Sequence, residues 1–352
     1  MSPAFSIYLD VLRLAAALLV FVHHASYARY HGTALQGLAG YGHEAVVVFF
    51  VLSGYVIAYS REHKDLDWRH YAVQRLSRLW SVALPAIVLT TVLDAGGRSL
   101  LPALYEPVPG GWGRVLASVC FVNEFWIEGW EAGSNIPLWS LSYEAGYYLL
   151  FGVLSFAGPR WRWPLALLCG LLVGPRVLLL LPAWWMGVWI HRSPRVHAME
   201  ASRGALVAAV GLAWALVLVL GKVGNRFITW RLLELLPQSA VQLLGASDAF
   251  ISDNLIALGV AAHVAGMSAW LRGRHVPAWQ GHWVPLLSRA TFPIYLFHYP
   301  LLQFFSALAA VWPPLALGGV TVLSLALSAA FTGPCEQLRQ VLRRGLARLL
   351  RA

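Results

Sequence analysis

Long apolar runs, separated by short polar or basic segments, make up most of this chain. A run of about 20 apolar residues is long enough to cross a bilayer as a helix. The runs predict about ten such helices, at residues 8–28, 44–60, 80–95, 112–127, 138–157, 163–190, 204–220, 250–271, 290–310 and 314–334. The run at 112–127 is weak and fits a re-entrant segment as well, and the run at 163–190 is interrupted at Gly174-Pro175-Arg176 and at Pro182. The expected fold is an all-α, polytopic transmembrane helical bundle.

The composition supports this expectation. Hydrophobic residues make up 59% of the 352 residues and charged residues only 12%, which is too little polar surface to cover a water-soluble body of this size. The runs are interrupted by Gly, Pro and Trp and lack the alternation of a β-barrel strand. We expect a single integral-membrane domain over residues 1–352, in contact with the lipid bilayer.

The basic residues indicate an orientation. A formal net charge of +10 would suggest nucleic acid in a soluble protein, but anionic lipid and cytoplasmic loops account for it here, so no nucleic-acid partner is expected. With a cytoplasmic N-terminus, the segments on that side hold roughly twice as many basic residues as the opposite side, which predicts that both termini are cytoplasmic. The loop at 124–137 is acidic although this topology places it in the cytoplasm, so the local topology there stays open.

The first predicted helix carries Asp10, Arg13, His23 and His24 inside a span. A charged side chain at the centre of a membrane costs roughly 2.5 to 3.5 kcal/mol, so Arg13 needs a partner or a water-lined cavity. Arg13 and His24 are eleven residues apart, about three helical turns plus 20°, so they share one face. His23 points about 100° away from His24. The helix therefore presents a charged group and a proton-transfer group along one line.

Other candidate positions have two readings each. Ser53 and Gly54, near the middle of the second predicted helix, suit a packing notch or a ligand contact. Arg75 and Arg78 lie one turn apart on one face and suit a phosphate clamp or an anchor on anionic lipid. His298, in the ninth predicted helix, fits a hydrogen-bonded core histidine better than a catalyst.

Glu144 lies two turns into the fifth predicted helix, where a carboxylate is protonated, ion-paired or functional. Arg13 and His24 are the obvious partners, and a purely structural ion pair is the alternative. The three cysteines are odd in number and lie in apolar context, which argues against a disulfide framework or a metal cluster, and no metal ion is expected.

Five motifs spread over nearly the whole chain carry a family resemblance. They are Leu9-Asp-Val-Leu-Arg13 followed by His24, Phe49-Phe-Val-Leu-Ser-Gly54, the Arg75 and Arg78 stretch, Trp139-Ser-Leu-Ser-Tyr-Glu144, and Ile294-Tyr-Leu-Phe-His298-Tyr-Pro300. In this order the chain resembles the acyltransferase 3 family. The resemblance implies a helical bundle in a bacterial inner membrane that transfers an acyl group, often acetyl, from cytoplasmic acyl-CoA to a hydroxyl. Acceptors in the family are commonly sugars of surface polysaccharides, with macrolides and other secondary metabolites as well.

The chain also departs from the family pattern. Many members have a carboxylate where Val47 stands, and a second acidic residue where Ala145 follows Glu144. Any role that these two acidic residues have in other members is therefore absent here. The identity of the acceptor cannot be inferred from the family resemblance.

The residues and the resemblance together assign roles. Acyl transfer from a thioester needs a base or a nucleophile, and the neutral imidazole of His24 suits either. Arg13 would orient the thioester carbonyl or a CoA phosphate, and Glu144 would fix the tautomer of His24. Arg75 and Arg78 would hold the CoA phosphates.

The remaining motif residues, Asp10, Ser53, Trp139 and His298, are expected to contribute to substrate binding. The expected donor is acyl-CoA, acetyl-CoA above all, as a substrate and not a bound cofactor. The expected acceptor is a sugar or glycan hydroxyl, with a macrolide as the alternative, and the oligomeric state is left open. A transporter or flippase that uses the intramembrane charges as a proton relay is the rival function. The arginine pair and the lack of internal repeats favour the enzyme.

Overall fold

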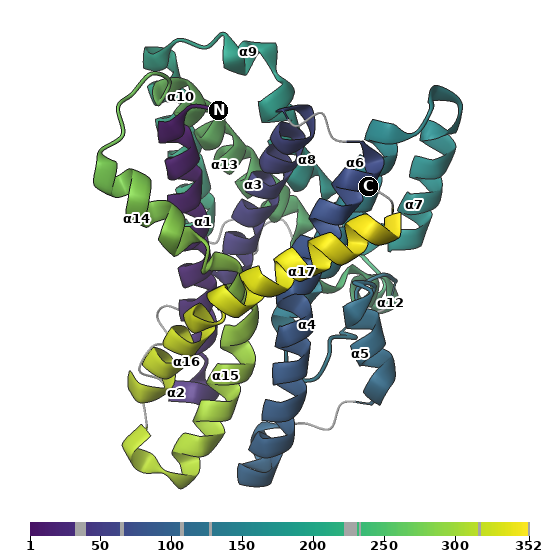
Figure 1. The fold of residues 1–352 in the computed structure, drawn as a ribbon, viewed down its shortest axis with the longest axis vertical. Helices are drawn as coiled ribbons and strands as arrows, with labels where there is room; N and C mark the ends of the chain where they lie inside the picture. Colours follow the sequence, from purple (N-terminus) through teal and green to yellow (C-terminus); the bar gives the residue numbers. More distant parts are fainter. Residues whose placement is uncertain are drawn as a thin grey trace. The chain divides into compact units, whose positions relative to one another are not determined.

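The computed structural model describes residues 1–31, 40–63, 67–105, 109–126, 129–221, 231, 234–315 and 318–350. Every regular element in these ranges is a helix (Figure 1). The α-helices are α1 (Pro3–Ala25), α2 (Ala28–His31), α3 (Gly42–His63), α4 (Trp68–Leu100), α5 (Gly111–Val119), α6 (Trp139–Phe156), α7 (Pro159–Leu179), α8 (Leu181–Arg192), α9 (Pro194–His197), α10 (Ala201–Gly221), α12 (Gln238–Leu244), α13 (Phe250–Trp270), α14 (Ala278–Ser288), α15 (Thr291–Val311), α16 (Gly318–Ala330) and α17 (Thr332–Leu350). Short 3₁₀ turns are η2 (Pro102–Leu104), η3 (Ile136–Leu138), η5 (Gly245–Ser247) and η6 (Pro313–Leu315).

Within the described ranges, eight helical segments are long and apolar enough to cross a membrane. They are Pro3–Ala25, Gly42–His63, Trp68–Leu100, Pro159–Leu179, Ala201–Gly221, Ala240–Trp270, Thr291–Val311 and Gly318–Leu350. The predicted polytopic helical bundle is confirmed, with eight candidate spans where the apolar runs suggested about ten.

The two missing spans have separate causes. The run at 112–127 contains only α5, whose nine residues reach about 13.5 Å, well short of a hydrocarbon core about 30 Å thick. The prediction of a span there is wrong. The run at 138–157 does form a helix, α6, but its 18 residues include Ser140, Ser142 and Glu144, and it is too polar to count as a candidate span.

The predicted interruption of the sixth run is confirmed. Gly174 has φ +83° and ψ 170° inside α7, which only glycine adopts without strain, and the helix kinks there. A new helix, α8, begins at Leu181 with Pro182 in its first turn, where the missing N–H is not needed.

Five charged residues on which the predicted orientation depends, in the predicted loops and the C-terminal segment, lie outside the described residues. They are Lys64, Glu128, Lys222, Arg226 and Arg351. The predicted orientation of the chain therefore stays a prediction.

The helices form two compact units whose segments alternate along the chain. Unit 1 comprises Met1–Ala16, His43–Leu66 and Gly174–Ser288. In it, α10 lies along α13, and small residues of each helix face the backbone of the other. Such residues let helix backbones approach closely where lipid removes the hydrophobic drive for association.

Unit 2 comprises Ala17–Gly42, Asp67–Val173 and Arg289–Ala352. In it, α15 packs against α4 and α16, and α17 packs against α4. The rings of Phe297 and Phe331 stack with centroids 4.2 Å apart, which joins α15 to the segment between α16 and α17. Most residues of α15 are buried, so this helix is the core of unit 2.

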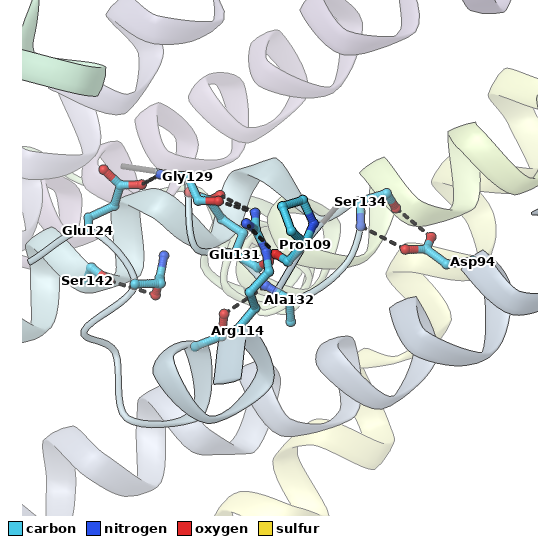
Figure 2. A network of polar contacts seen from close by, with 11 residues as sticks. Asp94, Pro109, Arg114, Glu124, Gly129, Glu131, Ala132, Ser134 and Ser142 are labelled. Atoms are coloured by element: carbon cyan, nitrogen blue, oxygen red, sulfur yellow. Dashed lines mark hydrogen bonds and ion pairs between the residues drawn. The ribbon is translucent and has the colours of Figure 1, made fainter. Parts of the chain in front are cut away.

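A buried polar loop connects α5 to α6 (Figure 2). Arg114 of α5 donates from Nε to the Glu131 carbonyl at 3.0 Å and also donates to the Gly129 carbonyl. The Gly129 N–H donates to Glu124 Oε1 at 3.1 Å. Asp94 of α4 accepts from Ser134 twice, at 2.7 and 2.6 Å. These bonds satisfy backbone groups that a loop without helical structure would otherwise leave unpaired.

The carboxyl groups of Glu124 and Glu131 are both buried in this loop. Burial, and then the adjoining Glu124 carboxyl, raise the pKa of Glu131 well above its usual range, although the Arg114 guanidinium lies 3.9 Å away. The raised pKa keeps the proton on Glu131, so the fold neutralises this one carboxyl group of the acidic loop.

Candidate active site

Two histidines meet inside unit 2. His24 lies near the C-terminal end of α1, and His298 lies in α15. The Nδ1 atom of His24 is 2.8 Å from Nε2 of His298, and Nδ1 of His298 is 2.8 Å from the Ile294 carbonyl oxygen one turn earlier. His298 is 0% exposed, whereas His24 is partly exposed. The two imidazoles and one carbonyl therefore form a continuous polar row.

The turn of α15 that carries His298 is held by an unusual bond. Pro300 has no N–H, so the Leu296 carbonyl lacks the donor that a regular helix supplies four residues later. Asn135 Nδ2 donates to that carbonyl at 3.0 Å and contacts Thr90 Oγ1 at 3.1 Å. The side chain of the fully buried Asn135 thus replaces the missing bond and links α15 to α4.

Tyrosines surround the His24 ring. Tyr299 and Tyr27 contact it edge-on, with centroids 5.0 and 5.4 Å away. The Arg29 guanidinium lies over the rings of Tyr30, Tyr27 and Tyr299, at 4.9, 5.2 and 5.6 Å, and donates to the Tyr299 hydroxyl. The Arg29 cation therefore packs on Tyr27 and Tyr299, the two tyrosines that contact the His24 ring.

The two adjacent histidines of α1 have different surroundings. His23 Nδ1 accepts the Gly40 N–H at 2.8 Å, and its Nε2 lies 3.1 Å from the Tyr27 hydroxyl. Both ring nitrogens of His23 are thus in hydrogen bonds, whereas His24 is the histidine that meets His298. This agrees with the angular separation expected of neighbouring helical residues.

The charged pair at the start of α1 lies in unit 1. Arg13 NH1 is 3.4 Å from Asp10 Oδ1, one turn apart on the helix, and both side chains are about one-fifth exposed. The sequence suggested Arg13 or His24 as the partner of Glu144; the structure pairs Arg13 with Asp10, and Glu144 accepts a hydrogen bond from Tyr148.

Glu144 lies in a second cluster of unit 2, between α6 and α4. The Tyr148 hydroxyl donates to Glu144, and the Tyr71 hydroxyl donates to the Tyr148 carbonyl at 2.9 Å. The Arg75 guanidinium lies 5.8 Å from the Tyr148 ring and 5.7 Å from the Tyr71 ring, and the charges of Arg75, Arg78 and Glu144 all act on Tyr148. The fold therefore brings Glu144 to Arg75 and Arg78, two predicted site residues that lie more than 60 residues earlier in the sequence.

The other predicted positions have ordinary packing partners. Arg78 lies 5.9 Å from the Phe292 ring, and Trp139 packs edge-on against Tyr143 with centroids 5.1 Å apart. In unit 1, Trp184 Nε1 donates to Ser53 Oγ at 3.2 Å, and the neighbouring Gly54 lies against the backbone of α8.

Sequence reasoning missed several groups around His24. Tyr299 stood in a quoted motif without a role, whereas Arg29 and Tyr27 stood in none. The available signal was the tyrosine-rich segment directly after α1. An arginine among aromatic residues, close in sequence to a candidate base, indicates a functional site. Asn135 had no signal, because its function depends on a proline 165 residues later.

These features define an integral-membrane protein with a row of two hydrogen-bonded histidines and a cluster of arginines with a carboxylate, groups that suit proton transfer and anion binding. Residues 6–333 match the acyltransferase 3 family, whose description is "Acyltransferase domain". The match covers nearly the whole chain, so the chain belongs to this family and is a multi-pass membrane acyltransferase. The resemblance inferred from the five motifs is confirmed, and so is the expectation of an enzyme.

One curated relative is Acyltransferase MdmB of Streptomyces mycarofaciens, which is 34% identical over 152 residues. The aligned part is 40% of this chain and 36% of that protein, so the match spans little more than a third of the relative's length. No solved structure matches the chain.

Proposed function

We propose that this acyltransferase moves an acyl group, acetyl in the first place, from acyl-CoA to a hydroxyl of a sugar or glycan acceptor, with His24 as the base or nucleophile. The observation that carries the proposal is the contact of His24 with His298, because a partly exposed imidazole held by a buried one is suited to proton transfer. Family membership supplies the reaction class, and the donor and acceptor are the proposed part.

As a base, His24 takes the proton of the acceptor hydroxyl while the hydroxyl oxygen attacks the thioester carbonyl. The carbon–sulfur bond then breaks, and the CoA thiolate leaves with the proton from the imidazolium. As a nucleophile, His24 instead displaces the CoA thiolate and holds the acyl group until the acceptor oxygen attacks, which breaks the acyl–nitrogen bond and releases the acceptor's proton to the thiolate. Both routes end with an ester and free CoA thiol.

The arginines provide the charge that the donor requires. Arg75 and Arg78 hold the CoA phosphates, since guanidinium matches phosphate geometry, and Glu144 orients Arg75 through the cluster around Tyr148. Arg13, held by Asp10, orients the thioester carbonyl or a CoA phosphate. Four further motif residues are expected to bind substrate, namely Asp10, Ser53, Trp139 and His298; Ser53 and Trp139 keep that role here, and Asp10 acts by holding Arg13.

We further propose that the chain is one acyltransferase domain in a bacterial inner membrane with both termini in the cytoplasm. The family match runs through segments of both units, which supports a single functional domain. The excess of basic residues in the segments assigned to the cytoplasm supports the orientation.

The test is release of free CoA thiol from acetyl-CoA by the detergent-purified protein. Glucose, N-acetylglucosamine and the macrolide erythromycin serve as acceptors, with acetylated product identified by mass spectrometry. We expect acceptor-dependent thiol release that His24→Ala lowers by about 10²- to 10⁴-fold, the usual contribution of a general base. His23→Ala is the matched control and retains most activity. Release with erythromycin alone would replace the sugar by a macrolide as acceptor, and a dead His23→Ala beside an active His24→Ala would refute the assignment.

A further inference from the structure

His24, His298 and the Ile294 carbonyl form a row of two hydrogen bonds. When both imidazoles are neutral, only one arrangement of protons satisfies both bonds. A backbone carbonyl accepts and never donates, so the 2.8 Å contact with the Ile294 oxygen places a proton on His298 Nδ1. Neutral His298 then has a lone pair on Nε2, which accepts. The contact at 2.8 Å places a proton on His24 Nδ1, and the lone pair of His24 is left on Nε2.

The alternative arrangement requires a cationic His298 that donates from both nitrogens. His298 is 0% exposed, and the charged groups that face the row are the Arg29 guanidinium beside Tyr299 and the neighbouring His23. Two carboxylates act on the neighbours of the row, Asp94 on Tyr299 and Glu144 on Tyr295, but among the described residues no carboxylate is hydrogen-bonded to either imidazole. An additional buried cation here, beside Arg29, would therefore be desolvated without an ion pair to offset the cost. The neutral row is therefore the stable one.

We propose that His298 is a positioning residue that holds His24 in the tautomer with the lone pair on Nε2, so that Nε2 is the nitrogen that reacts. This inference rests on the proposed function of His24 and replaces the expectation that His298 binds substrate. It applies to both routes, because the same lone pair takes either the acceptor's proton or the acyl group.

The surroundings keep this arrangement rigid. Rotation of the His24 ring about its Cβ–Cγ bond would put a carbon in place of Nδ1, and the edge-on contacts with Tyr27 and Tyr299 restrict that rotation. The turn of α15 that presents His298 is fixed by the bond from Asn135 to the Leu296 carbonyl. When Nε2 gains a proton, the Nδ1–H bond to His298 remains in place and stabilises the imidazolium, so no group has to reorient during the reaction.

The experiment compares His298→Gln with His298→Leu. Glutamine and leucine are similar in size, but only glutamine has an oxygen that can accept the His24 Nδ1–H. The control is His263→Leu, which removes another intramembrane histidine whose Nδ1 lies 2.8 Å from a backbone carbonyl, that of Ala208. We measure thermal stability in detergent, and kcat and KM for acetyl-CoA and for whichever of glucose, N-acetylglucosamine or erythromycin the wild type acetylates best.

We expect His298→Leu to lower kcat on the order of 10- to 100-fold with both KM values within about twofold, as for loss of a hydrogen bond to a charged group. His298→Gln should recover much of that loss, and His263→Leu should leave kcat unchanged. Equal kcat in the leucine and glutamine variants, or a raised KM with normal kcat, would overturn the inference. If His298→Leu does not fold, His298→Met provides the same comparison. Full activity of His24→Ala would refute the proposed function itself, which separates the two failures.

Discussion

The crossing of α3 and α8 in unit 1 allows a quantitative test of the packing reading of the Ser53-Gly54 motif. A Cβ added at Gly54 would lie 1.9 Å from the Trp184 carbonyl oxygen and 3.0 Å from its carbonyl carbon. On the opposite helix, a Cβ added at Gly187 would lie 2.0 Å from the Val51 carbonyl oxygen. The obstructing atoms belong to helix backbones, so no side-chain rotation can relieve the clash, and the two helices must separate.

The size of the effect follows from these distances. Real Cβ contacts are essentially never under 3.0 Å, so Gly54→Ala requires the backbones of α3 and α8 to move apart by about 1 Å or more. Overpacking of this kind typically costs about 1 to 3 kcal/mol, against which alanine regains up to about 1 kcal/mol of helix propensity. We expect a net loss of roughly 1 to 2 kcal/mol. The double variant with Gly187→Ala should cost less than the sum, because the first substitution has already opened the crossing.

The assay is thermal unfolding in detergent, followed by fluorescence of the 17 tryptophans. The matched control is Gly345→Ala in α17, where an added Cβ meets nothing within 4 Å. Gly54→Ala should lower the unfolding temperature and Gly345→Ala should not. Equal temperatures for the two variants, or strict additivity with Gly187→Ala, would refute the packing argument. Normal stability of Gly54→Ala with a raised KM for acetyl-CoA would favour the ligand-contact reading instead.

Three further predictions concern charged groups. Because the folded-state pKa of Glu131 is raised, the stability it contributes is present at low pH and is lost as pH rises above the usual carboxyl range towards that raised pKa. Glu131→Gln should flatten this decline in unfolding temperature between pH 5 and 9, and an unchanged decline would contradict the raised pKa of Glu131. Arg13→Lys should lose most acyl transfer although the charge remains, because an ammonium cannot bind bidentately, and near-wild-type turnover would reduce Arg13 to a counter-ion. Replacing Arg75 and Arg78 together with Gln should raise KM for acetyl-CoA more than for an acetyl-pantetheine thioester that lacks the nucleotide, and an equal change for both donors would assign these arginines to lipid or to packing.

Much of the architecture could be predicted from the chain because it depends on local properties. Apolar runs of sufficient length determine where helices cross the membrane, and the interruption at Gly174 and Pro182 follows from the backbone preferences of those two residues. The run at 112–127 misled the prediction, since a buried loop that satisfies its polar groups through Arg114 and Asp94 can be as apolar in sequence as a span.

Some residues of the candidate site could also be predicted from local properties of the sequence. Arg13 and His24 share a helix, so their common face follows from helical geometry, and the five motifs indicated the family. Their roles in the reaction stay predictions. The partner of Arg13 was not predictable from charge alone, because Asp10 and Glu144 are both carboxylates. Glu144 meets Tyr148 one turn later on its own helix, but only the packing of α6 beside α4 brings this pair to Arg75.

The five motifs were sufficient to identify a membrane acyltransferase, and they singled out His24 as the candidate for the proposed chemistry. The nitrogen of His24 that we propose to react could be assigned only from the tertiary structure, because the assignment depends on an imidazole 274 residues away and on the carbonyl that this imidazole contacts. A hydrogen bond requires two atoms to lie within about 3 Å, and no periodicity in the chain specifies such a distance between separate helices. Only the packing of α15 in unit 2, with Asn135 bonded to the carbonyl that Pro300 leaves without a donor, brings His298 to His24.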